Sequence, residues 1–220
     1  MKTGILFDLD GTLLDTLQDL TDAVNHMMER YGCPSRTPQE IRSFIGNGAR
    51  QLLVLSAGER AEQLDMDRVL EEYKQYYDAN CQVNTAPYPG IPEALAKIRK
   101  NYPVAIVSNK PDGAVKALCR HYFGDIYALG ETPACPRKPA PDMLHKAMKQ
   151  LGVDRCIYVG DTEVDLLTAQ NAGAVCICVP WGFRDRQVLE AHGGRHYCEQ
   201  AEQLLPTIET IINQEVIYGQ

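Results

Sequence analysis

Three clusters of polar residues each stand directly after a short apolar run of the sequence. The run Ile5–Phe7 precedes two aspartates, the run 104–107 precedes a Ser-Asn pair, and the run 157–159 precedes a Gly-Asp-Thr-Glu-Val-Asp segment. In open parallel sheets, ligands bind beyond the carboxyl ends of the strands. We therefore expect the following side chains to converge in space although they are far apart in the sequence: Asp8, Asp10, Ser108, Asn109, Asp161 and Asp165.

The four carboxylates of this set would repel one another unless a cation lay between them. An all-oxygen site of this kind suits Mg²⁺, which binds few protein ligands and keeps waters and a substrate phosphate. Lys138 offers a fixed positive charge, and Ser108 with backbone N–H groups near Gly11 offers donors to phosphoryl oxygens. Asp10, two residues after Asp8, is placed to protonate a leaving alkoxide and later to activate water. The pattern predicts phosphoryl transfer.

The elements that must position these residues alternate between apolar runs and helical patterns. Apolar strands that lack alternating polarity and are separated by helices indicate a parallel sheet covered on both faces. The fold class is therefore α/β, with a doubly wound, Rossmann-like sheet. The predicted strands are 4–7, 104–107, 126–129, 156–159 and 175–179. The predicted helices between them are 91–100, 112–122, 141–151 and 163–172.

A helical stretch separates the first predicted strand from the rest of this sheet. Apolar residues at helical spacing predict a helix from Thr16 to Tyr31, which Gly32 and Pro34 end. The segment Thr37–Glu40 has the pattern of a capping box, and further helical pattern covers 50–57 and 67–80. We therefore expect two domains: a catalytic core, residues 1–14 and 86–220, and a helical cap domain inserted after the first strand, residues 15–85.

Composition and charge limit the binding partners and the cellular location that we expect for this protein. The chain has 220 residues and a net charge of −7, with no basic stripe, so nucleic acid is not expected as a partner. Apolar runs are too short to span a membrane, and the N-terminal segment lacks the pattern of a secretory signal. The eight cysteines form no C-x-x-C pair, which predicts free thiols in a cytoplasmic protein. Cys176 and Cys178 share a strand face, but that pair alone is half a metal site and favours core packing.

The motifs Asp8–Thr12, Ser108-Asn109, Lys138 and Gly160–Asp165 resemble the four ordered motifs of the haloacid dehalogenase-like hydrolases. The resemblance implies Asp8 as nucleophile and metal ligand, and Asp10 as general acid/base and as a metal ligand through its carbonyl. It implies Asp161 as a metal ligand and Asp165 as a direct or water-mediated one. It also implies phosphate binding by Ser108 and Lys138, and we count the neighbouring Gly11 and Asn109 as further candidate phosphate-binding residues.

Three further segments resemble the phosphoglycolate phosphatase group of that family: Asn171–Ala174, Trp181–Arg184, and Ile45–Ala49 in the expected cap. The resemblance implies a Mg²⁺-dependent phosphatase acting on a small phosphate ester, with 2-phosphoglycolate as the leading substrate. In one interpretation, Asn47, Gly48 and Arg50 face the substrate when the cap closes. In the other, these residues start a helix and Arg50 is solvated.

Other functions remain open from the sequence. Inorganic pyrophosphate, a nucleotide or a sugar phosphate would satisfy the core motifs equally well. The next alternative function is a β-phosphoglucomutase-like phosphomutase, although Thr12 fits the phosphatases better. The last alternative is a non-enzymatic phosphorylatable or binding domain. The carboxylate of Asp10 favours phosphoryl chemistry over carbon–halogen cleavage, because a halide leaves without a proton. Ser108-Asn109 also has the alternative of a helix N-cap, and monomer and homodimer are both compatible with the sequence.

Overall fold

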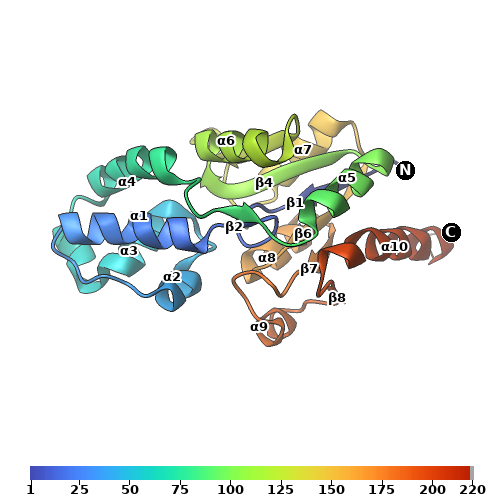
Figure 1. The fold of residues 1–220 in the computed structure, drawn as a ribbon. Coiled ribbons are helices and arrows are strands. Elements are labelled where there is room, and N and C mark those ends of the chain that lie inside the picture. Colours follow the sequence, from blue (N-terminus) through green and yellow to red (C-terminus); the bar gives the residue numbers. More distant parts are fainter. Residues whose placement is uncertain (219–220) are drawn as a thin grey trace.

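The computed structural model describes residues 1–218, and its centre is a six-stranded parallel sheet (Figure 1). The strand order is β5-β4-β1-β6-β7-β8, with crossovers between neighbours that are distant in sequence. This confirms the predicted doubly wound α/β fold. The strands are β1 (Thr3–Phe7), β4 (Val104–Pro111), β5 (Tyr127–Glu131), β6 (Arg155–Gly160), β7 (Val175–Cys178) and β8 (His196–Tyr197).

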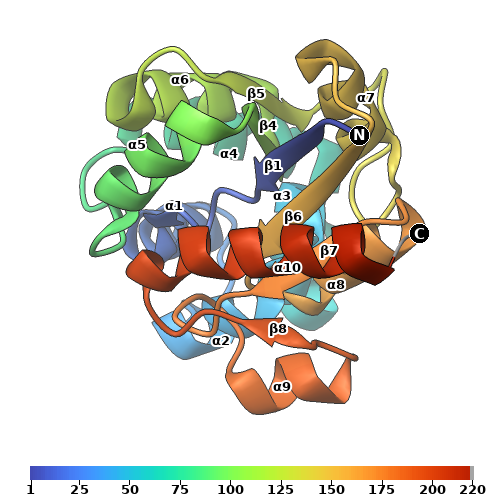
Figure 2. The same cartoon turned by 90° about the vertical axis from the view of Figure 1, so that its right-hand side faces the viewer.

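Helices cover both faces of this sheet (Figure 2). Successive residues of β1 point to opposite faces: Ile5 and Phe7 belong to one buried cluster and Leu6 to a second. The first cluster includes residues of α5, α6 and α10, and the second includes residues of α7 and α8. These helices are α5 (Ile91–Asn101), α6 (Asp112–Phe123), α7 (Asp142–Leu151), α8 (Glu163–Asn171) and α10 (Leu204–Tyr218).

The register of the sheet aligns the ends of the strands that carry the predicted site. Phe7 lies opposite Ile106 of β4 and opposite Val159 of β6. The residues that follow these three positions therefore reach the same edge of the sheet. The Asp8 amide continues the pairing by donating to the Val159 carbonyl over 2.9 Å.

Residues 15–85, which we call the helical insert, lie beyond that edge (Figure 1). Two short strands border the insert, where Asp15 pairs antiparallel with Ala86. The predicted capping box is present, because Thr37 Oγ1 accepts from the Glu40 amide over 3.2 Å and a Glu40 carboxylate oxygen accepts from the Thr37 amide over 2.8 Å. The elements are β2 (Leu14–Asp15), α1 (Leu17–Arg30), α2 (Pro38–Phe44), α3 (Gly48–Ala57), a 3₁₀ turn (Gly58–Gln63), α4 (Met66–Asn80) and β3 (Ala86–Pro87).

Three features of the fold differ from the sequence prediction. The expected all-helical stretch from Asp15 begins in β2, because a two-residue strand has no periodicity to read. The strand predicted at 104–107 continues to Pro111 and carries the polar Ser108–Lys110 segment with it. Beyond Val179 no element is predicted, but the structure adds α9 (Arg186–Ala191), β8 and α10. All eight cysteines are free thiols, as predicted.

Candidate active site

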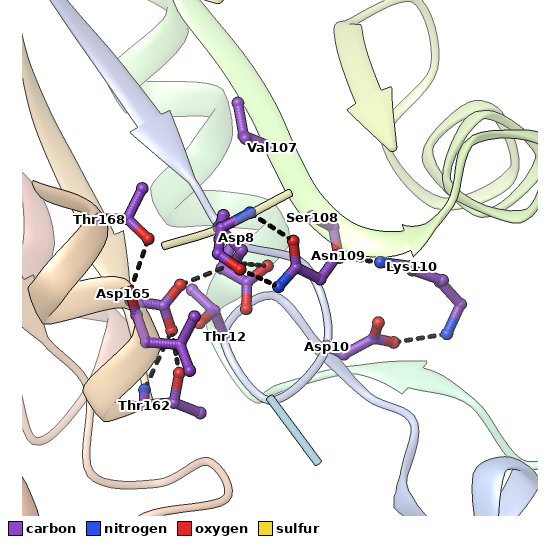
Figure 3. Close-up of polar contacts among 12 residues, drawn as sticks. Asp8, Asp10, Thr12, Val107, Ser108, Asn109, Lys110, Thr162, Asp165 and Thr168 are labelled. Atoms are coloured by element: carbon purple, nitrogen blue, oxygen red, sulfur yellow. Dashed lines mark hydrogen bonds and ion pairs between the residues drawn. The ribbon is translucent and has the colours of Figure 1, made fainter. Parts of the chain in front are cut away.

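Three buried carboxylates meet at the carboxyl edge of the sheet, and Figure 3 labels two of them, Asp8 and Asp165. One oxygen each of Asp8, Asp161 and Asp165 lies within 4.8 Å of the others. Asp8 follows β1, Asp161 follows β6, and Asp165 stands in the first turn of α8. The predicted convergence of these three residues is therefore present. The donor set is all carboxylate oxygen and buried, which fits a hard divalent cation such as Mg²⁺ or Mn²⁺.

Lys138 supplies the positive charge of this cluster. Its Nζ lies 2.8 Å from Asp8 Oδ1, 2.7 Å from Asp165 Oδ1 and 2.9 Å from the Tyr158 hydroxyl. Burial lowers the pKa of Lys138, but Asp165 and Asp8 outweigh burial, so the pKa is raised and the ammonium stays charged. Lys138 is thus a buried charged residue of the site and not a surface lysine of the loop.

The cluster still holds more negative charge than Lys138 neutralises. Burial raises the pKa of Asp8 to about 7; Lys138 opposes this shift and Asp165 adds to it. Burial, followed by Asp165 and Asp8, also raises the pKa of Asp161 well above its ordinary value. Raised pKa values at two buried carboxyls mean that their charged forms lack sufficient counter-charge. A bound cation would supply it.

Asp161 is held on both of its oxygens. Thr12 Oγ1 donates to Oδ1 over 2.9 Å, and the Phe183 amide donates to Oδ2 over 2.7 Å. A Cβ on Gly11 would stand 2.2 Å from Asp161 Oδ2, so this close approach, together with a φ of +82°, requires glycine. The Gly11 amide donates to the Leu14 carbonyl over 2.8 Å. Gly11 therefore shapes the turn beside Asp161, and its amide is engaged within that turn.

Asp165 makes four contacts within the protein. Lys138 Nζ and the Tyr158 hydroxyl reach Oδ1, while the Thr162 amide and hydroxyl donate to Oδ2 over 3.0 and 2.7 Å. These contacts satisfy most of its acceptor capacity. Asp165 therefore anchors Lys138 and the start of α8, in addition to adding negative charge to the cluster.

Ser108 and Asn109 have different roles in the site. Ser108 is buried and lines a cavity above Asp8. The Asn109 side chain donates to the Gly46 carbonyl over 3.0 Å and to the Lys138 carbonyl over 2.9 Å, and accepts from the Lys138 amide over 2.8 Å. Asn109 thus fastens the Lys138 loop and the helical insert to β4. The alternative of a helix N-cap is wrong, because both residues lie within β4 and α6 begins only at Asp112.

This cavity lies between the strand ends and the helical insert, and it measures about 60 Å³. That is far below the roughly 300–1,000 Å³ of pockets for drug-sized ligands. Its polar lining comes from the core and its apolar lining chiefly from the insert. The lining residues are Asp8, Asp10, Leu20, Ile45, Gly46, Gly48, Ala49, Leu52, Tyr73, Tyr77, Ser108, Asn109, Lys110, Pro111, Lys138, Thr162 and Phe183.

The three cap residues singled out from the sequence are placed differently. Gly48 lines the cavity and has a φ of +80°. Asn47 is the N-cap residue of α3 and lies outside the cavity lining. Arg50 Nη2 lies 3.2 Å from Asp67 Oδ1, and both side chains are more than half exposed. In this structure the solvated interpretation of Arg50 therefore holds.

Lys110 is a site residue that the sequence analysis misses. Its side chain is 3% exposed, and its Nζ lies 2.7 Å from Asp10 Oδ1 (Figure 3) and 2.6 Å from the Tyr77 hydroxyl. Asp10 therefore lies outside the three-carboxylate cluster and forms an ion pair with Lys110. Its position in the sequence could have indicated that Lys110 belongs to the site, because Lys110 directly follows the Ser108-Asn109 pair on the same strand. A longer strand prediction would have placed it at the site.

The family model described as haloacid dehalogenase-like hydrolase matches residues 5–179, which includes all four motifs. The chain belongs to this family. A haloacid dehalogenase-like hydrolase family protein of Streptococcus pneumoniae shares its fold, with a TM-score of 0.84 at 23% identity over 94% of this chain and 98% of that one. The predicted family membership is confirmed.

Relatives within the family carry phosphatase names. The phosphoglycolate phosphatase of Mesorhizobium japonicum is 34% identical over 84% of this chain and 86% of its own length. The N-acetylmuramic acid 6-phosphate phosphatase of Pseudomonas aeruginosa is 31% identical over 87% of each chain. A structure from Lactobacillus delbrueckii subsp. bulgaricus, itself provisionally assigned as a phosphoglycolate phosphatase, has a TM-score of 0.85 at 39% identity over 93% of this hydrolase and 97% of that chain.

Within residues 1–218, no helix of this hydrolase combines the length and hydropathy needed to cross a bilayer.

Proposed function

We propose that this haloacid dehalogenase-like hydrolase is a Mg²⁺-dependent phosphatase that transfers a phosphoryl group from a small phosphate monoester to Asp8 and then to water. The observation that carries the proposal is the position of Lys138, whose ammonium lies 2.7–2.8 Å from both Asp8 and Asp165. That ammonium holds the Asp8 carboxylate beside the cavity and offers a charge to a phosphoryl oxygen. The names of the relatives support the same reaction class.

The cation would be held by the carboxylates of Asp8 and Asp161, with Asp165 close by. When bound, it would offset the charge of these residues and of the incoming phosphate, so that an anionic nucleophile can approach an anionic substrate. Thr12 and the Phe183 amide keep Asp161 oriented for this role. Ser108 is placed to donate to a phosphoryl oxygen from β4, the strand beside β1.

In the first half-reaction an Asp8 oxygen forms a bond to phosphorus, and the ester oxygen–phosphorus bond breaks. The carboxyl group of Asp10 gives its proton to the leaving alkoxide. In the second half-reaction a water oxygen attacks phosphorus, Asp10 takes the proton of that water, and the Asp8–phosphorus bond breaks. Inorganic phosphate and the alcohol are the products, and Asp8 and Asp10 return to their starting states.

We propose phosphoglycolate as the substrate. Several relatives carry that name, and the small cavity favours a small ester over an amino-sugar phosphate. The helical insert would act as a cap domain that closes over the site and excludes water. We also place the enzyme in the cytoplasm, which its eight free thiols support.

The test is phosphate release from a panel of phosphoglycolate, pyrophosphate, nucleotides, N-acetylmuramic acid 6-phosphate and other sugar phosphates, with Mg²⁺ present. We expect the highest kcat/KM for phosphoglycolate and no turnover by Asp8→Asn. Asp125→Asn, an exposed aspartate far from the cavity lining, is the matched control. Wild-type turnover by Asp8→Asn would refute Asp8 as the nucleophile. Isomerisation of a sugar phosphate without net phosphate release would favour the mutase instead.

A further inference from the structure

A second buried lysine, Lys110, lines the cavity, and the two half-reactions proposed above do not use it. Lys138 already provides the ammonium beside Asp8 and Asp165. Lys110 reaches the same cavity from β4, and Figure 3 shows it with Asp10 on the side of Asp8 away from Asp165. A buried ammonium is costly unless it meets negative or polar partners. The surroundings of Lys110 indicate what those partners are.

Lys110 is held by one residue of the core and one of the helical insert. Besides the 2.7 Å contact with Asp10 and the 2.6 Å hydrogen bond to the Tyr77 hydroxyl, its Nζ lies 4.4 Å from the centre of the Tyr77 ring. Tyr77 belongs to α4, so the position of this ammonium depends on the insert being closed over the core. Its three N–H donors are not exhausted by two hydrogen bonds.

The other described residues that line the cavity near Lys110 carry no positive charge. The insert contributes Leu20, Ile45, Ala49, Leu52 and Tyr73, which are apolar or aromatic. Among the described residues that line the cavity, Lys110 and Lys138 are the two cations. Arg50, the arginine of the neighbouring helix α3, is at the surface with Asp67. An anionic group remote from the phosphate would therefore find its counter-charge at Lys110.

We propose that Lys110 is the specificity-determining residue that recognises the carboxylate of a substrate carrying both a phosphate and a second anionic group. This inference rests on the proposed function and names the residue that makes a carboxylated ester the preferred substrate. Lys138 and Ser108 contact the phosphate end, while Lys110, positioned by Tyr77, contacts the other end. The Lys110 ammonium then binds both the second anionic group of the substrate and Asp10. The ester oxygen lies between the two anionic groups, and Asp10 therefore stays close to it.

The experiment compares two substrates of the same length, 2-phosphoglycolate and 2-hydroxyethyl phosphate, which differ in whether the far end carries a carboxylate. We expect wild-type kcat/KM to be higher for 2-phosphoglycolate. Lys110→Met should reduce that preference by roughly 10- to 100-fold, the loss expected for one charge-assisted hydrogen bond. The ratio of the two substrates separates recognition from any effect on Asp10, because Asp10 acts on both esters. Rescue of the ratio by Lys110→Arg would show that the charge is responsible.

Two further variants keep the test decisive. Tyr77→Phe removes the hydroxyl that positions Lys110 but keeps the ring, so it should lower the preference less, and it serves if Lys110→Met does not fold. Lys116→Met changes an exposed lysine of α6 and should leave the ratio unchanged. An unchanged ratio in both Lys110→Met and Tyr77→Phe would overturn the inference while phosphate release continues. Absence of phosphate release from either ester by the wild type would instead overturn the proposed function.

Discussion

Arg184 of the core donates from Nη2 to the backbone carbonyl of Ile45, between α2 and α3, over 2.9 Å. Its Nη1 donates to the Arg42 carbonyl over 2.9 Å, and Glu163 holds the guanidinium at 2.7 and 3.0 Å. In return, Arg42 Nη2 donates to the Gly182 carbonyl over 2.8 Å. Two arginines therefore fasten the helical insert to the loop that also orients Asp161.

Arg184→Met should loosen the insert and reduce turnover. The variant loses two hydrogen bonds to the insert and leaves Glu163 without its partner, which costs about 1–3 kcal/mol of unfolding free energy. Misplacement of the insert should lower kcat/KM by up to roughly 10²-fold. Amide hydrogen exchange at residues 42–48 should accelerate. Arg186→Met is the matched control, because the contacts of that exposed arginine are with Glu190, Glu199 and the Tyr197 ring, all of the core. Equal effects of the two variants would contradict the fastening role.

Asp10→Asn should lower kcat for phosphoglycolate by about 10²–10⁴-fold, because the amide provides no proton for the leaving alkoxide. With p-nitrophenyl phosphate the first half-reaction should be much less affected, since that leaving group departs without a proton. The measurement is a single-turnover comparison of the two substrates. Equal losses with both leaving groups would argue that Asp10 acts only by positioning Lys110.

The metal-free protein should become less stable as the pH rises. The folded-state pKa of Asp8 is raised to about 7 from an ordinary value of 3.8, so the folded state binds more protons than the unfolded state between these values. The unfolding free energy should therefore fall as the pH rises from about 4 to about 7. Asp8→Asn should flatten this dependence, and thermal unfolding across that range would measure both.

Mg²⁺ should oppose that loss of stability. A cation that binds the folded cluster stabilises it by mass action, and the gain grows as the carboxyls ionise. The shift of Tm by Mg²⁺ should thus be larger at pH 8 than at pH 5. Asp161→Asn should remove most of the shift. A shift that does not depend on pH would place the cation outside the three-carboxylate cluster.

Asp19→Asn should destabilise the junction between insert and core. The buried Asp19 carboxylate accepts hydrogen bonds from the amides of Val83, Asn84 and Thr85 over 2.8–3.1 Å, and from the Asn84 and Thr85 side chains. An asparagine would turn an NH₂ group toward these donors, at a cost of about 2–3 kcal/mol of unfolding free energy. Asp22→Asn, at an exposed position of the same helix, should cost little.

The pKa of Asp19 gives this contribution its pH dependence. Burial works to raise the pKa, but the hydrogen bonds from Thr85 and Asn84 outweigh it, so the pKa is lowered. The stabilisation is therefore fully present above the ordinary value of 3.8 and is lost as the pH falls through the lower folded value. Acid unfolding of Asp19→Asn should lack this component, and a wild-type acid transition in the variant would show that Asp19 does not contribute it.

Much of the core could be predicted from the sequence because apolar strands and helical spacing are local signals. The convergence of Asp8, Asp161 and Asp165 followed from one rule about strand ends. A longer strand prediction would have placed Lys110 at the same edge, but its contacts with Asp10 and with Tyr77 of the insert could not be predicted, since no local pattern encodes such a pair. The position of Arg50 likewise depends on a surface partner, Asp67, on another helix.

Asn109 and Gly11 show a second limit of the sequence. Their motifs mark them as site residues, but a motif does not tell which partner a polar group selects. The side-chain amide of Asn109 donates to the carbonyls of Gly46 and Lys138, and the backbone amide of Gly11 donates to the Leu14 carbonyl within its own turn. Direct contact with phosphate by either residue remains a prediction, which a structure with bound phosphate would test.

The pairing of β2 with β3 places Asp15 opposite Ala86, so the chain leaves the core and returns to it at adjacent points. A segment with neighbouring ends can be exchanged without lengthening any connection or breaking the sheet. Transplanting residues 16–85 from a relative with another substrate would put a different recognition surface over the same reacting carboxylates. The part of the recognition surface that the insert carries would then be inherited separately from the reacting carboxylates, while Lys110 of β4 would stay with the core.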